Sequence, residues 1–379
     1  MEAVISMRKA IIMKIIFIIA GLFLIYQLII NFMIDQDYLK LRKLNFQPET
    51  IEKIKAYNII NEVLEKNKYS KTLEESLLTN QFHKPNFDLY YEIPFVDNAA
   101  FIPNINKLVT RGYNKTQIIL IFKYLNIKEI TRLLNHNLIS DIEKYIVFDY
   151  FLVGNLERYL NYQKKTNHSY HQVITQVNIG LDNPFYTNIK EIKDPHRLTV
   201  LVNKYHHLPN TFIPDDLSPV NDNLVVKTIQ LRTEVKKAFE KMGNEAQTNG
   251  LNLKGTSGFR SYDEQKQLYN YYVSQDGKEL ADHYSARAGH SEHQTGLAID
   301  VVGPDEQLDN FEKTEEFKWL LKHHHEYGFI IRYPKDKEYI TGYQYEPWHL
   351  RYVGVSIASY IKENNLTFDE YYIQKLDKK

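Results

Sequence analysis

The stretch Ser291-Glu-His-Gln-Thr-Gly-Leu-Ala-Ile-Asp-Val-Val302 carries most of the information about the fold and chemistry of this chain. Its apolar half, from Leu297 onward, predicts a buried strand interrupted by one acid, Asp300. A buried carboxylate is costly unless it is paired or binds a metal. His293 lies seven residues earlier, and on one continuous strand this odd separation would put the two side chains on opposite faces. Gly296 supplies a turn through which they can converge.

A second stretch, Glu346-Pro-Trp-His349, places a carboxylate three residues before a histidine. A carboxylate at this spacing can act as a general base beside a metal ligand. Pro347 argues against a helix, so the geometry must come from an irregular strand or turn. Taken alone, this stretch favours an edge-strand turn with a partly exposed ion pair. The first stretch alone favours a surface histidine and an aspartate bonded to backbone amides.

Together the two stretches favour a metal site. Two histidines and a carboxylate, with the fourth position left to water, hold zinc in several hydrolases. Imidazole and carboxylate without thiolate suit zinc better than calcium or magnesium. We therefore expect His293, Asp300 and His349 to bind one Zn²⁺, with Glu346 accepting a proton from the attacking water and later passing it to the leaving amine.

A third stretch, Ser257-Gly-Phe-Arg-Ser-Tyr-Asp-Glu-Gln265, places Arg260 at a strand end just before a helix that opens with a capping box at Ser261. An arginine here can reach the same cleft, and its planar fork suits a carboxylate or a developing oxyanion. Taken alone, this third stretch favours a surface arginine in a loop salt bridge.

The three motifs, SGFRSYDEQ (257–265), GHSEHQTGLAIDVV (289–302) and YEPWHLRYVG (345–354), resemble in order and spacing the VanY family of zinc-dependent D-alanyl-D-alanine carboxypeptidases. That family includes L,D-carboxypeptidases of peptidoglycan tetrapeptides. The resemblance covers roughly Val173 to Ile361, and it implies a small α+β fold with an antiparallel sheet under the site.

The resemblance also implies roles for individual residues and a location. The metal ligands match His293, Asp300 and His349, the catalytic glutamate matches Glu346, and the arginine near the reacting carbonyl matches Arg260. The implied substrate contacts are Gln265, Ser291 and Tyr345. Enzymes of this kind trim the last D-alanine from stem peptides outside the membrane, so the implied substrate is the peptidoglycan stem peptide.

The amino terminus predicts a membrane segment. Ile15 to Ile34 is a run of twenty residues without a charge, which matches a hydrocarbon core of about 30 Å. It lacks the small-residue cleavage site of a secretory signal peptide. We expect a cytoplasmic segment (1–14), an uncleaved single-pass signal anchor (15–34) in the cell membrane, and an extracellular catalytic domain.

The chain between the anchor and the motifs predicts an all-α, repeat-like region over 35–172. Leu41 to Ile54 and Leu108 to Ile121 share a leucine, an aromatic residue five positions on, and isoleucines ten and thirteen positions on, which indicates repeated helix–turn–helix units. The region shows no basic stripe. It is interpreted as a spacer or as a platform that docks to the wall or to a protein, followed by the peptidase domain over 173–379.

Further local patterns predict secondary structure within that domain. A helix through Val235 and Met242 is expected to close at Gly243, and Leu251-Asn-Leu253 alternates as a strand. Thr314 is expected to start a helix that Gly328 stops, followed by a strand from Phe329 to Tyr333. His323 and its neighbours His324 and His325 are expected on a solvated helix face.

Composition narrows the class of protein. Lys+Arg and Asp+Glu both number 47, so the net charge is zero, and nothing global indicates a nucleic-acid binder. The absence of cysteine excludes disulfides, thiolate metal sites and cysteine nucleophiles. The leading hypothesis is a membrane-anchored zinc carboxypeptidase, D,D- or L,D-specific. The alternatives are a wall-binding scaffold without turnover and an endopeptidase that cuts within the stem or cross-bridge.

Overall fold

The structure, a computed structural model, describes residues 2–377, with side chains in its first helix described at 13–30 and from 36 onward. The chain forms two compact units, residues 1–147 and 148–379. The domain boundaries expected at 14, 34 and 172 stay predictions. Residue 1 of the expected cytoplasmic segment and residues 378–379 of the expected peptidase domain lie outside the described residues.

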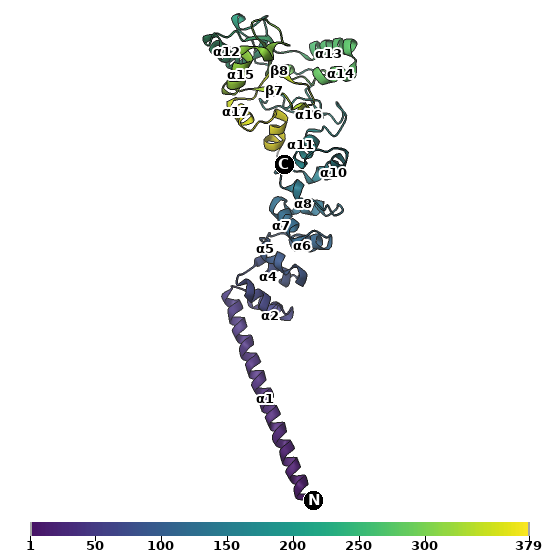
Figure 1. Cartoon of the computed structure of the whole chain (residues 1–379), viewed down its shortest axis with the longest axis vertical. Helices are drawn as coiled ribbons and strands as arrows, with labels where there is room; N and C mark the ends of the chain where they lie inside the picture. The colour runs from purple at the N-terminus through teal and green to yellow at the C-terminus, as the bar shows by residue number, and fades with distance from the viewer. Residues whose placement is uncertain (1, 378–379) are drawn as a thin grey trace. The chain divides into compact units, whose positions relative to one another are not determined.

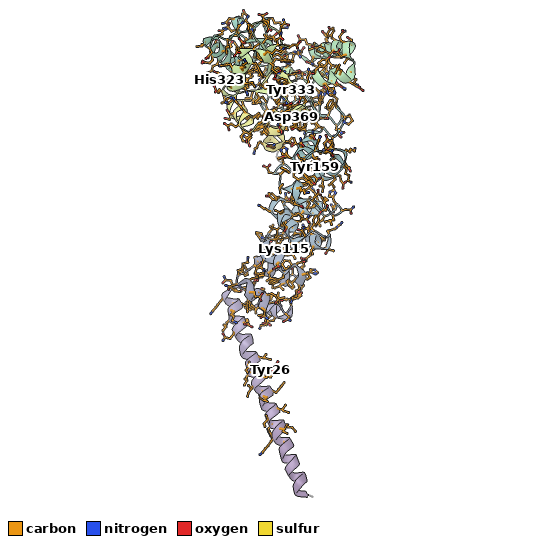
Figure 2. The ribbon with its side chains drawn as sticks, viewed as in Figure 1. Tyr26, Lys115, Tyr159, His323, Tyr333 and Asp369 are labelled. Carbon is orange, nitrogen blue, oxygen red and sulfur yellow. The ribbon has the colours of Figure 1, made fainter. Side chains whose placement is uncertain are left out.

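The first unit opens with α1 (Glu2–Lys43), a continuous helix of 42 residues. Within the described chain, one helix segment is long and apolar enough to cross a membrane: residues 13–30, with a mean hydropathy of 2.4. Its side chains, Tyr26 among them, project outward and are largely exposed (Figure 2). A membrane anchor and a signal sequence share this length and composition.

Short helices make up the rest of the first unit. They are α2 (Pro48–Ala56), α3 (Ile60–Lys66), α4 (Lys71–Leu78), α5 (Phe87–Glu92), α6 (Phe101–Thr110), α7 (Lys115–Tyr124), α8 (Ile127–Leu133) and α9 (Glu143–Ile146). The two similar segments of the sequence, Leu41 to Ile54 and Leu108 to Ile121, share one local geometry. Phe46 donates its backbone N–H to the carbonyl of Leu41 (3.3 Å), and Tyr113 donates to Leu108 (3.2 Å). In each segment this bond closes one helix just before the next begins.

The second unit combines helices with small sheets. Its helices are α10 (Leu156–Lys165), α11 (Tyr170–Ile179), α12 (Thr233–Thr248), α13 (Tyr262–Asp276), α14 (Lys278–Tyr284), α15 (Glu315–His323), α16 (Glu338–Thr341), α17 (Val355–Glu363) and α18 (Phe368–Tyr371). Its strands are β1 (Lys190–Glu191), β2 (His206–His207), β3 (Leu217–Pro219), β4 (Gln230–Arg232), β5 (Lys254–Ser257), β6 (Ala298–Val302), β7 (Phe329–Tyr333) and β8 (Glu346–Tyr352). Strands β5, β6, β8 and β7 form, in that order, one antiparallel sheet. The predicted α+β class with an antiparallel sheet is confirmed.

The core forms on one face of this sheet. Ile299 and Val301 of β6 share a buried apolar cluster with Phe239 and Met242 of α12. In Figure 1, α12 and α15 lie beside β7 and β8 on one side, with α13 and α14 on the other. Because side chains alternate along a strand, the residue between the two core positions, Asp300, faces away from this cluster. The face of β6 that carries Asp300 is therefore free for a polar site.

Several local predictions are confirmed and others are wrong. Capping at Ser261 and Thr314 and the strand from Phe329 to Tyr333 occur as expected. Gly328 ends the helical segment as expected, but its last turn, η6 (His324–Tyr327), is a 3₁₀ turn that follows the end of α15 at His323. Gly243, however, does not close a helix. It is buried within α12, where a Cβ would lie 3.0 Å from Leu224, so packing against this leucine explains the glycine.

Two further predictions of local structure are also wrong. Strand β5 begins at Lys254, beyond the predicted strand at 251–253, because pairing with β6 sets its position. His324 is not solvated: it is buried, and its Nδ1 lies 2.6 Å from the carbonyl of Phe329.

Candidate metal centre and active site

The two central strands bring Asp300 and His349 together. In the antiparallel pairing of β6 with β8 these residues are direct partners, and side chains of direct partners lie on the same face. Asp300 Oδ1 lies 3.0 Å from His349 Nδ1, yet Oδ1 has no hydrogen-bond partner among the described residues. A carboxylate oxygen and an imidazole nitrogen at this separation can bind the same ion.

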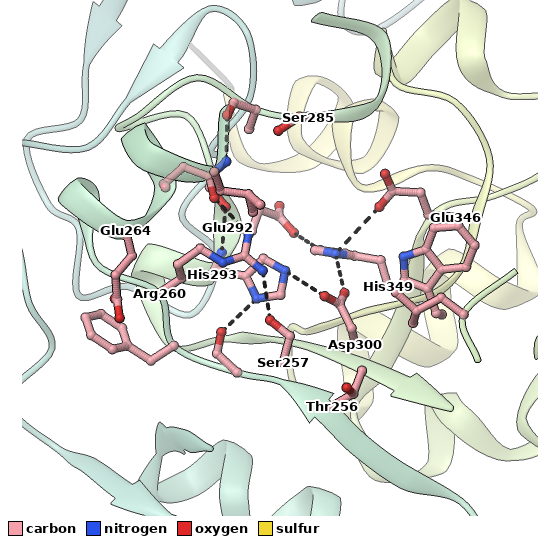
Figure 3. Close-up of a pocket in the computed structure, with 18 of the residues that line it drawn as sticks. Thr256, Ser257, Arg260, Glu264, Ser285, Glu292, His293, Asp300, Glu346 and His349 are labelled. Atoms are coloured by element: carbon pink, nitrogen blue, oxygen red, sulfur yellow. Dashed lines mark hydrogen bonds and ion pairs between the residues drawn. The ribbon is translucent and has the colours of Figure 1, made fainter. Parts of the chain in front are cut away.

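His293 reaches the same point from a neighbouring 3₁₀ turn, η4 (Glu292–Thr295). Gly296 ends this turn with φ +65°, as the predicted convergence requires. The His293 Nδ1 lies 2.7 Å from the carbonyl of Gly258, to which an Nδ1–H can donate. In that tautomer the lone pair is on Nε2, which lies 3.3 Å from Asp300 Oδ2 (Figure 3).

The three side chains fit a single zinc ion. Each offers one ligand atom, and the three atoms all lie within 4.8 Å of one another. All three residues are buried, and Asp300 Oδ1 is otherwise without a partner in the described chain. Two imidazoles, one carboxylate and no thiolate form a donor set that suits zinc in an open, catalytic type of site.

An irregularity in β8 places Glu346 beside this cluster. Three residues of β7, from Ile331 to Tyr333, face five residues of β8, from Glu346 to Leu350. The extra residues of β8 allow Glu346 and His349 to face one another, with Glu346 Oε2 3.8 Å from His349 Nδ1. The prediction of an irregular strand around Pro347 is confirmed.

Burial and charge shift the pKa values of these groups. Burial raises the pKa of Glu346 to about 8, with Asp300 adding to the rise and His349 and Arg260 opposing it. Burial would also raise the pKa of Asp300, but His293 and His349 outweigh it and hold this pKa well below its usual range. Of these two carboxyl groups, Glu346 is the one whose pKa lies near neutral pH, as an acid–base catalyst requires.

Arg260 is held at the edge of the cleft by two side chains. Its Nη1 donates to Gln265 Oε1 and its Nη2 to Ser257 Oγ, both at 2.8 Å. Gln265 is itself fixed, since its Nε2 donates to the carbonyl of Ala286 (2.7 Å). The guanidinium is thus pre-positioned in a way that a free surface arginine would not be.

The cluster lies in a pocket of about 1120 Å³ that is large enough for a peptide. Arg260, Gln265 and Ser291 line it, together with the metal-site residues. Tyr345, predicted as a substrate contact, is not among its lining residues; it packs half-buried against the core. Its neighbour Tyr343 lines the pocket instead.

One charged residue of the site, Glu292, was not predicted. It is 1% exposed, binds two buried arginines and lies next to His349. The signal that could have found it is the presence of Arg332 and Arg351 in apolar strands, because buried guanidiniums require acidic partners.

Comparison with known proteins identifies the class of protein. The family model described as D-alanyl-D-alanine carboxypeptidase (VanY) matches residues 228–355. One relative is YodJ of Bacillus subtilis strain 168, which is named "Putative carboxypeptidase YodJ". It is 40% identical over 206 residues, which cover 51% of this chain and 76% of YodJ. The bifunctional D-Ala-D-Ala dipeptidase and carboxypeptidase VanXYC of Enterococcus gallinarum is 35% identical over 181 residues, 45% of this chain and 92% of the relative.

Among solved structures, the LD-carboxypeptidase LdcB is 40% identical and covers 51% of this chain and 94% of its own, with a TM-score of 0.47. The assignment to a family rests on the sequence relatives, which are carboxypeptidases by name. The chain belongs to the VanY family of D-alanyl-D-alanine carboxypeptidases.

Proposed function

We propose that this chain is a membrane-anchored zinc carboxypeptidase that removes the C-terminal D-alanine from peptidoglycan stem peptides. The observation that supports this most strongly is the convergence of His293, Asp300 and His349 on one point, with Glu346 beside them. The matched family and relatives support the same substrate class.

The proposed chemistry assigns a step to each side chain. A zinc ion held by the three ligands supplies Lewis acidity. Glu346 accepts a proton from the attacking water and later delivers it to the amine of the departing D-alanine, since its pKa of about 8 allows transfer in both directions near neutral pH. Arg260, fixed by Gln265 and Ser257, stabilises the negative charge that develops on the scissile carbonyl oxygen.

The proposed location follows from the substrate and from α1. Peptidoglycan lies outside the cytoplasmic membrane, so the catalytic domain is proposed to be extracellular. The apolar run of α1 reaches membrane-spanning length and has no small-residue cleavage site, which favours an uncleaved single-pass anchor over a removed signal sequence.

The test uses the full-length chain, purified in detergent and loaded with Zn²⁺. Incubated with purified muropeptides, it is expected to release one alanine, detected by mass spectrometry as the loss of a single residue from pentapeptide (D,D) or tetrapeptide (L,D) stems. A chelator is expected to abolish release. Lack of turnover on both stems would contradict the proposal and favour a scaffold, and larger fragments would indicate an endopeptidase.

A further inference from the structure

Glu292 is a buried carboxylate for which the proposed reaction has no role. It opens η4, directly before His293, and is 1% exposed. Burying a carboxylate without partners is costly, so its surroundings indicate what it does. Those surroundings differ between its two oxygens.

The first oxygen is bound by two arginines. Glu292 Oε1 accepts from Arg332 Nε (2.7 Å) and from Arg351 Nη1 (2.8 Å), and both guanidiniums are fully buried. These arginines are fixed in turn: Arg332 Nη1 donates to Asp369 Oδ2 (2.6 Å), and Arg351 Nη2 donates to the carbonyl of Val200 (2.7 Å). Two carboxylates and two guanidiniums form a balanced cluster that fixes the position of Glu292.

The second oxygen faces the site. Glu292 Oε2 lies 3.6 Å from His349 Nε2, and neither atom has a hydrogen-bond partner among the described residues (Figure 3). The other nitrogen of the ring, Nδ1, points to the opposite side, 3.0 Å from Asp300 Oδ1. The imidazole of His349 therefore lies between the candidate metal position and the Glu292 carboxylate.

We propose that Glu292 is a positioning residue: its carboxylate accepts the Nε2–H of His349 and so keeps the lone pair of Nδ1 directed at the metal. This inference rests on the proposed zinc site. A neutral imidazole carries one N–H, so an acceptor at Nε2 selects the tautomer in which Nδ1 is free to bind a metal. Carboxylate partners of this kind orient ligand histidines and make them better donors.

The experiment measures zinc affinity, which does not depend on turnover. In Glu292→Gln the side chain keeps its shape and its amide oxygen can still accept from the arginines, but the negative charge beside His349 is lost. The dissociation constant for Zn²⁺, measured on the full-length protein by competition with a chromogenic chelator, is expected to rise about 10- to 100-fold. The visible absorption bands of the Co²⁺-substituted protein are expected to shift, because the ligand field of His349 changes.

Asp369→Asn is the matched control. It removes a charge from the same cluster on the far side of Arg332, away from His349. Both variants are expected to lower the melting temperature, but only Glu292→Gln is expected to weaken zinc binding. Glu292→Asp, which keeps the charge for the arginines and withdraws the carboxylate from His349, is expected to weaken it too, and it decides the matter if Glu292→Gln does not fold.

The outcomes separate the two proposals. Folded Glu292 variants that bind Zn²⁺ within about twofold of wild type would overturn the positioning role while leaving the proposed function intact. A wild-type protein that binds no zinc would overturn the proposed function itself.

Discussion

At the scale of single residues, the cleft holds two carboxylates with opposite electrostatic surroundings. Asp300 lies between two imidazoles that hold its pKa well below the usual range, whereas burial raises the pKa of Glu346 to about 8. Environments that separate the pKa values of neighbouring carboxyl groups mark one as a ligand or charged stabiliser and the other as the proton carrier. This separation gives the first prediction.

Replacing Glu346 by glutamine is expected to lower kcat by about 100- to 10,000-fold, the usual contribution of a general acid–base group. Zinc content, measured by mass spectrometry of the metal, is expected to stay at one ion per chain because the three ligands remain. Glu338→Gln, the same change at an exposed position of α16, serves as the control and is expected to keep full activity. A Glu346→Gln enzyme with wild-type turnover would remove the proposed base.

A second buried group, Lys204, is unusual for its type. Its Nζ lies 3.6 Å from the centre of the Tyr343 ring and donates to the carbonyl of Asp282. Burial lowers the pKa of Lys204 to about 7; the charges of Asp282 and Glu346 oppose this change and that of Arg287 adds to it. In the unfolded chain this lysine has its ordinary pKa near 10.4.

The sign of the resulting pH dependence follows from linkage. Between about pH 7 and pH 10 the unfolded chain binds a proton at Lys204 that the folded chain does not, so the stability contributed by this group rises with pH in that window. Lys204→Met removes the effect. We therefore compare the free energy of unfolding of the variant with that of wild type at two pH values. The difference, variant minus wild type, is expected to be about 2 kcal/mol more positive at pH 7 than at pH 9.

Urea unfolding followed by tryptophan fluorescence measures this difference, since Trp319 and Trp348 both lie in the second unit. Lys237→Met, at an exposed position of α12, is the control and is expected to show no pH-dependent difference. An equal effect of Lys204→Met at both pH values would contradict the lowered pKa.

Single residues were predictable where their type conflicts with the surrounding pattern. Asp300 in an apolar strand and Glu346 three residues before His349 were found in this way, although their roles stay predictions. Tyr345 was predicted as a substrate contact only from its place before the last motif, and the sequence does not show that Tyr343 is the tyrosine that lines the pocket.

At the scale of elements, the turn at Gly296 connects η4 to β6. Its φ is +65°, and a Cβ there would lie 2.9 Å from Arg232 Cγ. Gly296→Ala is therefore expected to lower the free energy of unfolding by roughly 1–3 kcal/mol and to reduce zinc affinity, because the turn sets the approach of His293 to Asp300. Chemical unfolding and chelator competition measure the two effects.

Gly250→Ala separates backbone strain from crowding. Gly250 has a similar φ of +75°, but a Cβ added there would meet no atom within 4 Å. Only the backbone contribution therefore applies, about 1–2 kcal/mol. Zinc affinity in this variant is expected to equal that of wild type. If Gly296→Ala bound zinc normally, the turn would have no part in assembling the site.

Elements were predictable where the signal is local. The caps at Ser261 and Thr314 are set by side chains within three residues of the backbone they bind, and both predictions hold. The glycine within α12 and the start of β5 are explained instead by packing against Leu224 and by pairing with β6, which lie far away in sequence. Tertiary packing therefore decided the elements that sequence patterns placed wrongly.

At the scale of the whole molecule, the prediction concerns α1. With epitope tags at both ends, the full-length chain is expected in the membrane fraction, released by detergent but not by high salt, with both tags retained. A variant that lacks residues 1–34 is expected to be lost from that fraction, because it lacks the apolar segment. Loss of the amino-terminal tag from the mature wild-type protein would indicate a cleaved signal sequence instead.

The region between the apolar segment of α1 and the three motifs was the least informative part of the sequence. Its helices could be predicted from the periodicity of apolar residues. The sequence similarity between the segments that begin at Leu41 and Leu108 corresponds to a shared helix–turn geometry. Neither pattern contains a chemically reactive group, so the spacer and the docking platform both stay predictions for 35–172. Function is inferred from the chemistry of the side chains at a site, and the packing of helices alone does not indicate it.

The origin of the three candidate ligands has a consequence for the cell. They come from one turn and two adjacent strands, so an ion bound to all of them would cross-link the middle of the sheet. Any ligand that prefers the folded chain adds to its stability in proportion to the logarithm of its free concentration. With zinc bound as proposed, scarcity of zinc would do more than slow turnover: it would shorten the lifetime of the protein by exposing it to proteolysis.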